Sequence, residues 1–476
     1  MTASEKPRYW LAPAGCALAI TAVLGSEFLR LPWPFVDLYN SFYKATTMTW
    51  PETFGHAFGA GVEYRPLMII GVKLSHQLVG LRAWCYELLV LLQFAAILLG
   101  LVWIWAPTTR SRATAACVAL ACVAGLHTSR VLFMFMPLNV HSLGVVILLA
   151  AILLALSPQS RLTQSFFPPL TLVALFLLES GVLVVAVTLV LWKMQAPNAG
   201  GRAVVGVLAA SAIYVAVRLG FGMQEAPAAY AETGLGFGDV ETARLRDIFE
   251  HAPWMLWAYN IVASFFTVIA SEPRAGRYLF VEALLSGRVP TWMYIHVVTS
   301  LITTGIVGYA LATSRVQGKD RLVAAAGMTL LVAGTALGFL YTRDRIALSA
   351  GVGYAMLLYV AVAAVLERHA AARPLGLTAA FVQVCIAVVF VGWSIRTAET
   401  YLQLRDAGWE HYREWTERYE ELGGLARSQT DLLMRLREDV LSQAPRDPRR
   451  DPPSTYMLFQ RRFDRLDTAV DRVRGE

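Results

Sequence analysis

The stretch AWCYELLVLLQFAAILLGLVWIWA at residues 83–106 decides the class of this fold. It contains a single charged side chain, Glu87, and it exceeds the roughly 20 apolar residues that a helix needs to cross a bilayer. Its apolar residues do not alternate with polar ones, as they would in a strand of a membrane barrel. Because backbone polar groups must be satisfied internally in hydrocarbon, we predict a membrane-spanning helix here.

Similar runs recur along the chain, which is 56% hydrophobic and only 16% charged. That composition is too apolar for a soluble protein of 476 residues. We therefore predict an all-α, polytopic membrane helical bundle with about eleven transmembrane helices, at roughly 20 residues each. The predicted spans are residues 9–26, 83–106, 113–128, 138–156, 166–192, 203–220, 251–270, 291–313, 322–341, 346–366 and 376–394.

One of these spans has an alternative interpretation. Glu179 and Gly181 interrupt residues 166–192, so this run also fits two short helices, in which case 251–270 lies along the membrane or re-enters it. Both versions leave the sidedness from residue 291 onward unchanged.

Basic residues indicate which loops share a side of the membrane. Alternate short loops carry Lys6, Arg8, Arg110, Arg112, Arg161, Arg315, Lys319, Arg321, Arg368 and Arg373. By the positive-inside rule these loops and the N-terminus are cytoplasmic. The opposite side then receives the loop of residues 27–82, the turns near 127–139 and 342–345, and the chain after 394.

The composition changes sharply after residue 394, where Arg and Glu become frequent. We predict a membrane domain over 1–394 and a small soluble α-helical domain over 395–476, with a helix break at Gly423-Gly424. The abundance of Ala, Arg and Gly indicates a bacterium with GC-rich DNA. The C-terminal domain would then lie in the periplasm, outside the inner membrane.

Several function classes do not fit the sequence. The five cysteines lie inside apolar runs without metal-ligand spacing, and the net charge of +7 is dispersed rather than gathered into a nucleic-acid-binding face. The phosphate-loop, HExxH and GxSxG patterns are missing from the sequence. Nucleotide hydrolysis, zinc or serine hydrolase chemistry and nucleic-acid partners are not expected.

Two short motifs follow the first apolar run: FVDLYN at 35–40 and EYRPL at 63–67. Placed before a hydrophobic helix, they resemble the first extracytoplasmic loop of GT-C glycosyltransferases. The nearest pattern is that of protein O-mannosyltransferases with luminal tetratricopeptide repeats, although no repeat period occurs here. LLESG at 177–181 is similar to that family's Lys-Glu-x-Gly element, and residues 341–358 are similar to the segment that opens one of its late helices.

The chain also departs from the family. Its acidic pair is reduced to Asp37-Leu38, and LHTSR at 126–130 replaces an HP-x-H-x-E element. The resemblance implies an inverting transfer of sugar from a polyprenyl-phosphate-linked donor to an acceptor hydroxyl on a protein, lipid or glycan. It implies no metal cofactor, although Asp37, His56 and Glu63 together leave a divalent ion open.

Such a transfer needs a carboxylate base and fixed cations for the departing phosphate. On this interpretation Asp37 is the base, and Arg65, Arg343 and Arg345 bind the donor phosphate. The remaining predicted site residues are His127 and Arg130 at the donor, with Glu179, Glu63 and Tyr64 in support.

Each assignment has a structural alternative. Asp37 would equally suit a helix cap, and Arg65 with Lys73 and His76 an interfacial helix that extends its cations to headgroups. One of the arginines around Asp344 would merely neutralise it, Arg130 would be a membrane anchor, and Glu179 a protonated structural acid. Two rival functions also stay open: a transporter or flippase for lipid-linked sugars, and a noncatalytic GT-C-like scaffold.

Overall fold

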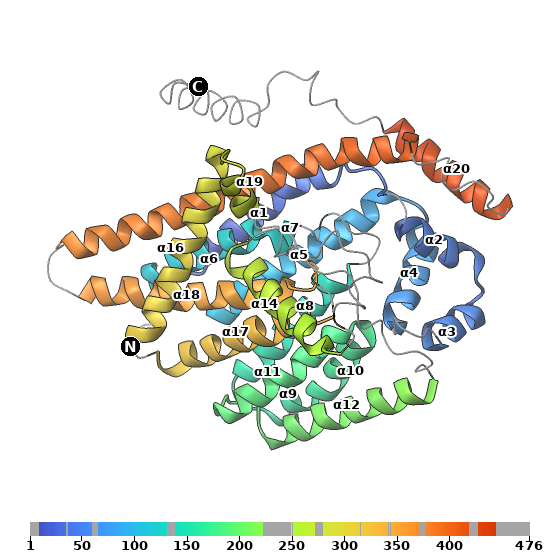
Figure 1. The fold of residues 1–476 in the computed structure, drawn as a ribbon. Coiled ribbons are helices and arrows are strands. Elements are labelled where there is room, and N and C mark those ends of the chain that lie inside the picture. Colours follow the sequence, from blue (N-terminus) through green and yellow to red (C-terminus); the bar gives the residue numbers. More distant parts are fainter. Residues whose placement is uncertain are drawn as a thin grey trace, which may run out of the picture.

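The computed structural model describes residues 9–34, 37–59, 65–130, 133, 139–221, 249, 251–271, 279–314, 316–340, 342, 344–371, 377–417 and 427–443. Within these residues all regular structure is helical, which confirms the predicted all-α class (Figure 1). The principal helices are α1 (Leu11–Phe28), α2 (Asp37–Thr47), α3 (Trp50–Gly59), α4 (Pro66–Val79), α5 (Ala83–Trp105), α6 (Arg110–Gly125), α8 (Val140–Leu156), α10 (Phe167–Leu177), α11 (Val182–Lys193), α12 (Gly201–Phe221), α14 (Pro253–Ile269), α16 (Thr291–Thr313), α17 (Gly318–Ala336), α18 (Leu348–Ala371), α19 (Leu377–Glu417) and α20 (Arg427–Ser442). Short helices are α7 (His127–Arg130), α9 (Arg161–Ser165), η2 (Glu179–Gly181) and α15 (Leu279–Leu285).

Six of the described helices are long and apolar enough to cross a membrane: α1, α5, α12, α16, α18 and α19. The chain is therefore a membrane protein by composition and helix length. The predicted count of about eleven spans is not confirmed by the same criterion. Several of the other predicted spans form helices that are shorter, such as α8 and α14 at 17 residues each.

α18 forms the centre of the bundle and is buried along most of its length. α6, α16 and α17 pack around it, and α18 and α17 approach most closely at Gly353 and Gly327. A Cβ atom built on Gly353 would lie 2.5 Å from the Gly327 carbonyl oxygen. Small residues are thus required at this crossing, as is common where membrane helices pack backbone to backbone.

The predicted run of residues 166–192 is divided into two helices, in agreement with one of the two alternatives. α10 ends at Leu177, Leu178 is extended with φ −161° and ψ 147°, and η2 makes a tight turn before α11 begins. The turn brings Gly181 back onto α10, where a Cβ atom would lie 2.4 Å from the Ala174 carbonyl carbon. Glu179 consequently lies at a break between two apolar helices.

The expected domain boundary at 394/395 falls inside one continuous helix. α19 has 41 residues, and Trp393, Arg396 and Trp415 on either side of that point are almost fully buried. Trp415 Nε1 donates to the Trp33 carbonyl oxygen at 2.8 Å. The first part of the presumed soluble tail is therefore part of the membrane bundle's own packing.

After α19, α20 forms an amphipathic helix that packs against α19 and α2. Its buried residues Leu432, Leu433, Leu436 and Val440 recur at helical spacing. α20 begins at Arg427, after the helix break predicted at Gly423-Gly424.

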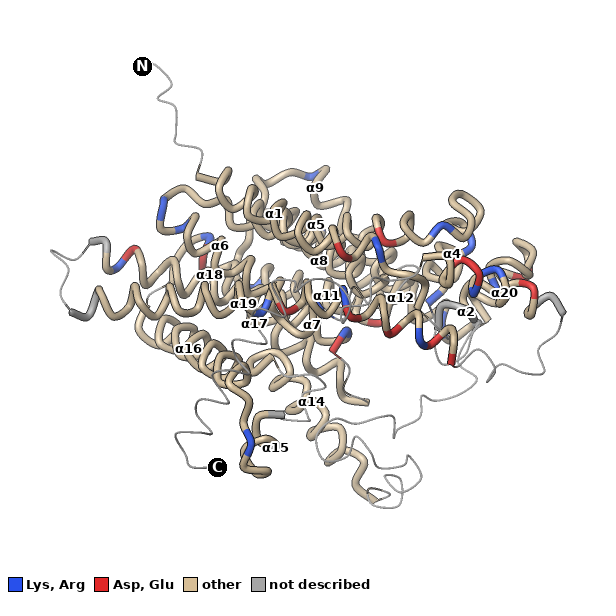
Figure 2. Tube along the Cα trace, turned by 90° about the horizontal axis from the view of Figure 1, so that it is seen from above, with Lys and Arg blue, Asp and Glu red and all other residues tan. Residues whose placement is uncertain are grey.

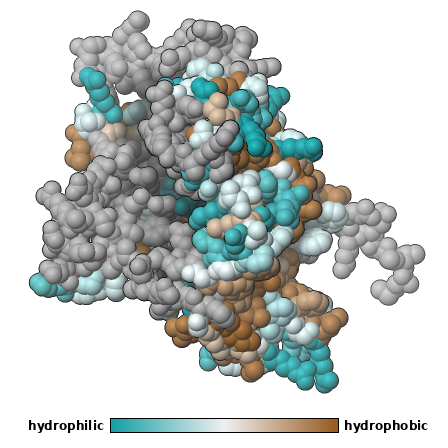
Figure 3. Space-filling view, turned by 90° about the vertical axis from the view of Figure 1, so that its right-hand side faces the viewer, coloured by the Kyte–Doolittle hydropathy of each residue, from teal (hydrophilic) through white to brown (hydrophobic). Residues whose placement is uncertain are grey.

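Charged residues gather at the two ends of the bundle and around α7, while most of the helix length between is almost free of them (Figure 2). α2, α3 and α4 lie together at one end (Figure 1). Seen from that end, hydrophilic atoms gather at mid-height and hydrophobic atoms lie below them (Figure 3). This end carries the first part of the candidate site.

Candidate functional site

Local sequence signals define the helices at this end of the bundle. Thr49 and Glu52 form a capping box at the start of α3, since the Thr49 N–H and hydroxyl donate to Glu52 Oε2 at 2.7 and 2.8 Å. Pro66 begins α4, where its missing N–H costs nothing. The YRPL motif thus places Arg65 immediately before a helix.

Lys73 connects α4 to α2. Its ammonium donates to the carbonyl oxygens of Ala45 at 2.7 Å and Met48 at 2.5 Å, at the C-terminal end of α2, and its side chain is buried. Carbonyl groups at a helix C-terminus favour a cation, so this contact holds the two helices together. The interfacial-helix alternative requires the Lys73 ammonium to extend to solvent, but the side chain is buried.

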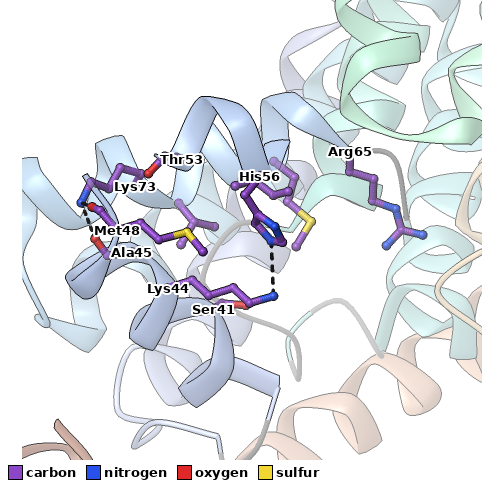
Figure 4. A pocket seen from close by; sticks show the side chains of 11 residues that line it. Ser41, Lys44, Ala45, Met48, Thr53, His56, Arg65 and Lys73 are labelled. Carbon is purple, nitrogen blue, oxygen red and sulfur yellow. Dashed lines mark hydrogen bonds between the residues drawn. The ribbon is translucent and has the colours of Figure 1, made fainter. Parts of the chain in front are cut away.

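A cavity of about 230 Å³ lies between α2, α3 and α4 (Figure 4). Four of the described residues that line it are basic, and none of those lining residues is a carboxylate. The lining residues are Ser41, Lys44, Ala45, Met48, Thr53, His56, Arg65, Met68, Ile69, Val72 and Lys73. The cavity therefore carries a local excess of positive charge.

The basic side chains of the cavity affect one another. Lys44 Nζ lies 3.3 Å from His56 Nε2. Burial, and then the charge of Lys44, lower the pKa of the His56 imidazole below its ordinary value. A neutral imidazole can accept a hydrogen bond from the Lys44 ammonium, which fits the short distance between the two groups.

Arg65 lies at the edge of this cavity and pairs with Glu179. Its Nε atom is 3.2 Å from Glu179 Oε2, and the side chains are 17% and 36% exposed. The pair joins the loop that follows the first helix to the break between α10 and α11. Two predicted site residues, 114 positions apart, are thus brought together.

Aromatic contacts brace the same region. Phe58 of α3 packs against Phe176 of α10, and Phe176 packs edge-to-face on Tyr214 of α12, with centroids 6.4 and 5.4 Å apart. Arg218 Nη1 donates to the Tyr214 hydroxyl at 2.9 Å. Sequence reasoning missed Tyr214 and Arg218, for which the available signal was their spacing of one helical turn within an apolar run.

A second group of predicted residues lies at α7. His127 Nε2 is 2.9 Å from Asp344 Oδ2, and the His127 N–H donates to Ser271 Oγ at 2.9 Å. Arg345 follows in the turn of residues 344–347 and is half-buried. Asp344 therefore pairs with His127, a partner that the sequence had not indicated.

Arg130, also in α7, forms hydrogen bonds with residues of α19 inside the bundle. Its Nη2 donates to Glu399 Oε2 at 2.8 Å and to the Arg396 carbonyl oxygen at 2.7 Å, and the residue is 6% exposed. His296 Nε2 lies 2.7 Å from the same Glu399 oxygen. These contacts describe a buried ion-pair network rather than a membrane-surface anchor.

Arg396 completes this network and was not predicted. It is fully buried, donates to Ser300 Oγ at 3.0 Å and to the Ser271 carbonyl oxygen at 2.9 Å, and lies over the Trp393 ring at 4.4 Å. A signal was present, since Arg396 and Glu399 stand three residues apart directly after an apolar run. It was assigned to a soluble tail.

Four predicted residues do not enter this geometry. Glu63, Tyr64 and Arg343 lie outside the described residues. Asp37 begins α2, but its side chain lies outside the description.

A metal site is not apparent in the part of the chain that the structure covers: no group of three or more His, Cys, Asp or Glu side chains forms there. Neither a protein-family model nor a curated protein matches this chain. The indications of function therefore come from the residues of the chain and their geometry.

Proposed function

We propose that this chain is an inverting, GT-C-type glycosyltransferase. It would move a sugar from a polyprenyl-phosphate donor to an acceptor hydroxyl on a protein, lipid or glycan. The proposal includes about eleven membrane crossings at roughly 20 residues each. It also includes a cytoplasmic N-terminus, and a C-terminal region on the periplasmic face of a bacterial inner membrane.

The Arg65–Glu179 pair beside the cationic cavity is the observation that carries the proposal. Arg65 belongs to the YRPL motif and Glu179 to LLESG, the two segments singled out by the resemblance to GT-C enzymes. Their contact is what a shared site requires, and it does not follow from helix packing alone. A shared fold does not by itself imply a shared function, so the proposal depends on the geometry of the site.

The charge of the cavity suits a departing phosphate. Lys44, Arg65 and Lys73 supply cations around a space of about 230 Å³, which matches a headgroup rather than a whole lipid. Fixed cations of this kind stabilise the negative charge that develops on the leaving group. Glu179 would orient the Arg65 guanidinium, whose planar geometry suits phosphate oxygens.

Asp37 is the proposed catalytic base. It begins α2, and Ser41, four residues later in the same helix, lines the cavity. Four residues correspond to about 6 Å of helix rise. A carboxylate at this position would accept the proton of the acceptor hydroxyl as it attacks the sugar.

Other predicted residues keep supporting roles in the proposal. Arg343 and Arg345 remain proposed phosphate ligands, with Asp344 already in contact with His127. Arg130 already pairs with the Glu399 carboxylate, so we assign it to the support of α7 rather than to direct contact with the donor. Glu63 and Tyr64 remain proposed neighbours of Arg65 in the loop.

The test is sugar transfer by the purified full-length chain from a panel of undecaprenyl-phosphate-linked sugars. Asp37→Asn should reduce transfer by about 100-fold or more, the range of a lost general base. Glu52→Gln is the matched control, because it changes an exposed carboxylate of the same loop while keeping its capping oxygen. Transfer by Asp37→Asn at the rate of the control would remove Asp37 from the mechanism.

A further inference from the structure

A second cavity, of about 650 Å³, lies at the opposite end of the bundle between α1, α6, α18 and α19. Its size falls within the usual range for small-molecule sites, which are mostly apolar with a few polar groups. Apolar lining residues include Leu11, Ala113, Val118, Leu366, Ile386 and Phe390. Polar groups are few, and Arg110 is the charged one among the described lining residues.

The cavity is a groove along two helices. α6 contributes Arg110, then Ala113 and Thr114, then Cys117 and Val118, which is the spacing of one helical face. This face extends over about 12 Å of helix rise. α19 supplies the facing wall at the same spacing, through residues 383, 386, 387 and 390. The groove therefore leads from a cation into apolar surroundings.

Arg110 differs from the arginine two residues later. Arg112 pairs with Asp320 at 2.7 Å and with Glu367 at 2.7 Å. Arg110 is exposed and has no ion pair within the described residues. The first turn of α6 also contains no acidic residue. Its helix N-terminus adds partial positive charge, so the mouth of the groove favours an anion.

The outer wall of the groove faces where lipid would lie. On α19, Phe381 is 68% exposed and Val384 is 58% exposed, and both helices that flank the opening, α1 and α19, are long and apolar enough to span a membrane. An occupant arriving from this side must be apolar along its length and anionic at one end. Basic pockets between membrane helices bind anionic lipid headgroups for this reason.

We propose that this groove binds an anionic phospholipid. One acyl chain lies between α6 and α19, and the headgroup phosphate contacts Arg110. The site is separate from the α2–α4 cavity, and the proposal does not depend on the glycosyltransferase function.

The experiment is native mass spectrometry of the detergent-solubilised full-length chain, titrated with phosphatidylglycerol or phosphatidylcholine. We expect one phosphatidylglycerol to bind about fivefold more tightly than phosphatidylcholine, as one surface cation near an anionic lipid allows. Arg110→Ala should abolish that preference. Arg161→Ala, which removes another exposed arginine, should leave it unchanged.

A second variant tests the groove itself. Ala387 is exposed and lines the groove, so Ala387→Trp fills it without disturbing buried packing. We expect loss of the tightly bound lipid while the thermal unfolding midpoint stays the same. Equal binding of the two lipids, equal effects of Arg110→Ala and Arg161→Ala, or undiminished binding to Ala387→Trp would each overturn the proposal.

Discussion

Arg65 and Arg112 lie at opposite ends of the bundle and both pair with carboxylates from distant helices, but their surroundings differ. Arg112 makes four hydrogen bonds to Asp320 and Glu367, at 2.7 to 3.3 Å, so one guanidinium faces two acids. Among the described residues, Arg65 pairs with the carboxylate of Glu179 and shares its cavity with Lys44, His56 and Lys73.

The difference is one of charge balance. Two acids fully compensate Arg112, which joins α6 to α17 and α18, and this is what a structural ion pair requires. Among its described lining residues the α2–α4 cavity keeps a positive excess, which favours binding of an anion. The partners of an arginine therefore distinguish a structural ion pair from a ligand-binding site better than its position in a loop does.

The largest expected effect is on phosphate binding at the α2–α4 cavity. Arg65→Ala should weaken binding of undecaprenyl phosphate about 30-fold, because it removes charge-assisted hydrogen bonds. Titration by native mass spectrometry would measure this, with Arg161→Ala as the control. An unchanged affinity in Arg65→Ala would mean that Arg65 and Glu179 form a brace like the pair at Arg112.

At the other end of the bundle, we expect a substitution of Arg112 to change folding stability rather than phosphate binding. Arg112→Ala removes the guanidinium with which both Asp320 and Glu367 pair. Because the three side chains are partly exposed, we expect a loss of about 2 kcal/mol of folding stability rather than the larger cost of a fully buried pair. Thermal unfolding in detergent would measure it, and undecaprenyl phosphate affinity should not change. A weakened affinity would show that the two ends are coupled.

Charge balance also predicts an effect of the opposite sign. Glu179→Gln keeps a hydrogen-bond acceptor for Arg65 but removes the negative charge. Affinity for undecaprenyl phosphate should rise about fivefold, the scale of one charge interaction at a partly exposed site. If affinity fell instead, Glu179 would act mainly by holding Arg65 in position.

The smallest expected effect is a pH dependence from His56. Burial and Lys44 lower the pKa of free His56, so it is neutral above about pH 6.5. A bound phosphate favours the imidazolium, so binding takes up a proton and should strengthen as the pH falls below about 6.5 toward the lowered pKa. The phosphate monoester titrates in the same range, with a second pKa of about 6.

His56→Asn isolates the contribution of the histidine. The ratio of wild-type to His56→Asn affinity should rise a fewfold, about two to five times, between pH 7.5 and pH 5.5. A flat ratio would place His56 outside the binding site.

Helix class and helix positions were predictable because apolar runs reveal them directly. The break at Glu179 was one of two alternatives, and only packing of Gly181 on Ala174 decides between them. The predicted boundary at 394/395 falls within the continuous helix α19. The composition becomes more charged there, whereas the buried face of α19, with Trp393 and Arg396, continues across this position.

Partners across the fold were the least predictable part of the site. A charged residue in an apolar region needs a partner of opposite charge, but the sequence does not show which residue that is. Arg130, for example, pairs with Glu399, which lies 269 positions away. The Arg65–Glu179 contact agrees with the prediction in kind, since Glu179 is predicted to support the residues that bind the donor. His127 with Asp344 carried no such signal.

The most direct test of the central claim compares undecaprenyl phosphate with undecaprenol on the full-length chain, because the two lipids differ only in the headgroup that the cationic cavity would hold. We predict that the phosphate binds at least about tenfold more tightly in the wild type, and that Arg65→Ala removes most of this difference. Equal affinities for the two lipids in the wild type would contradict the account.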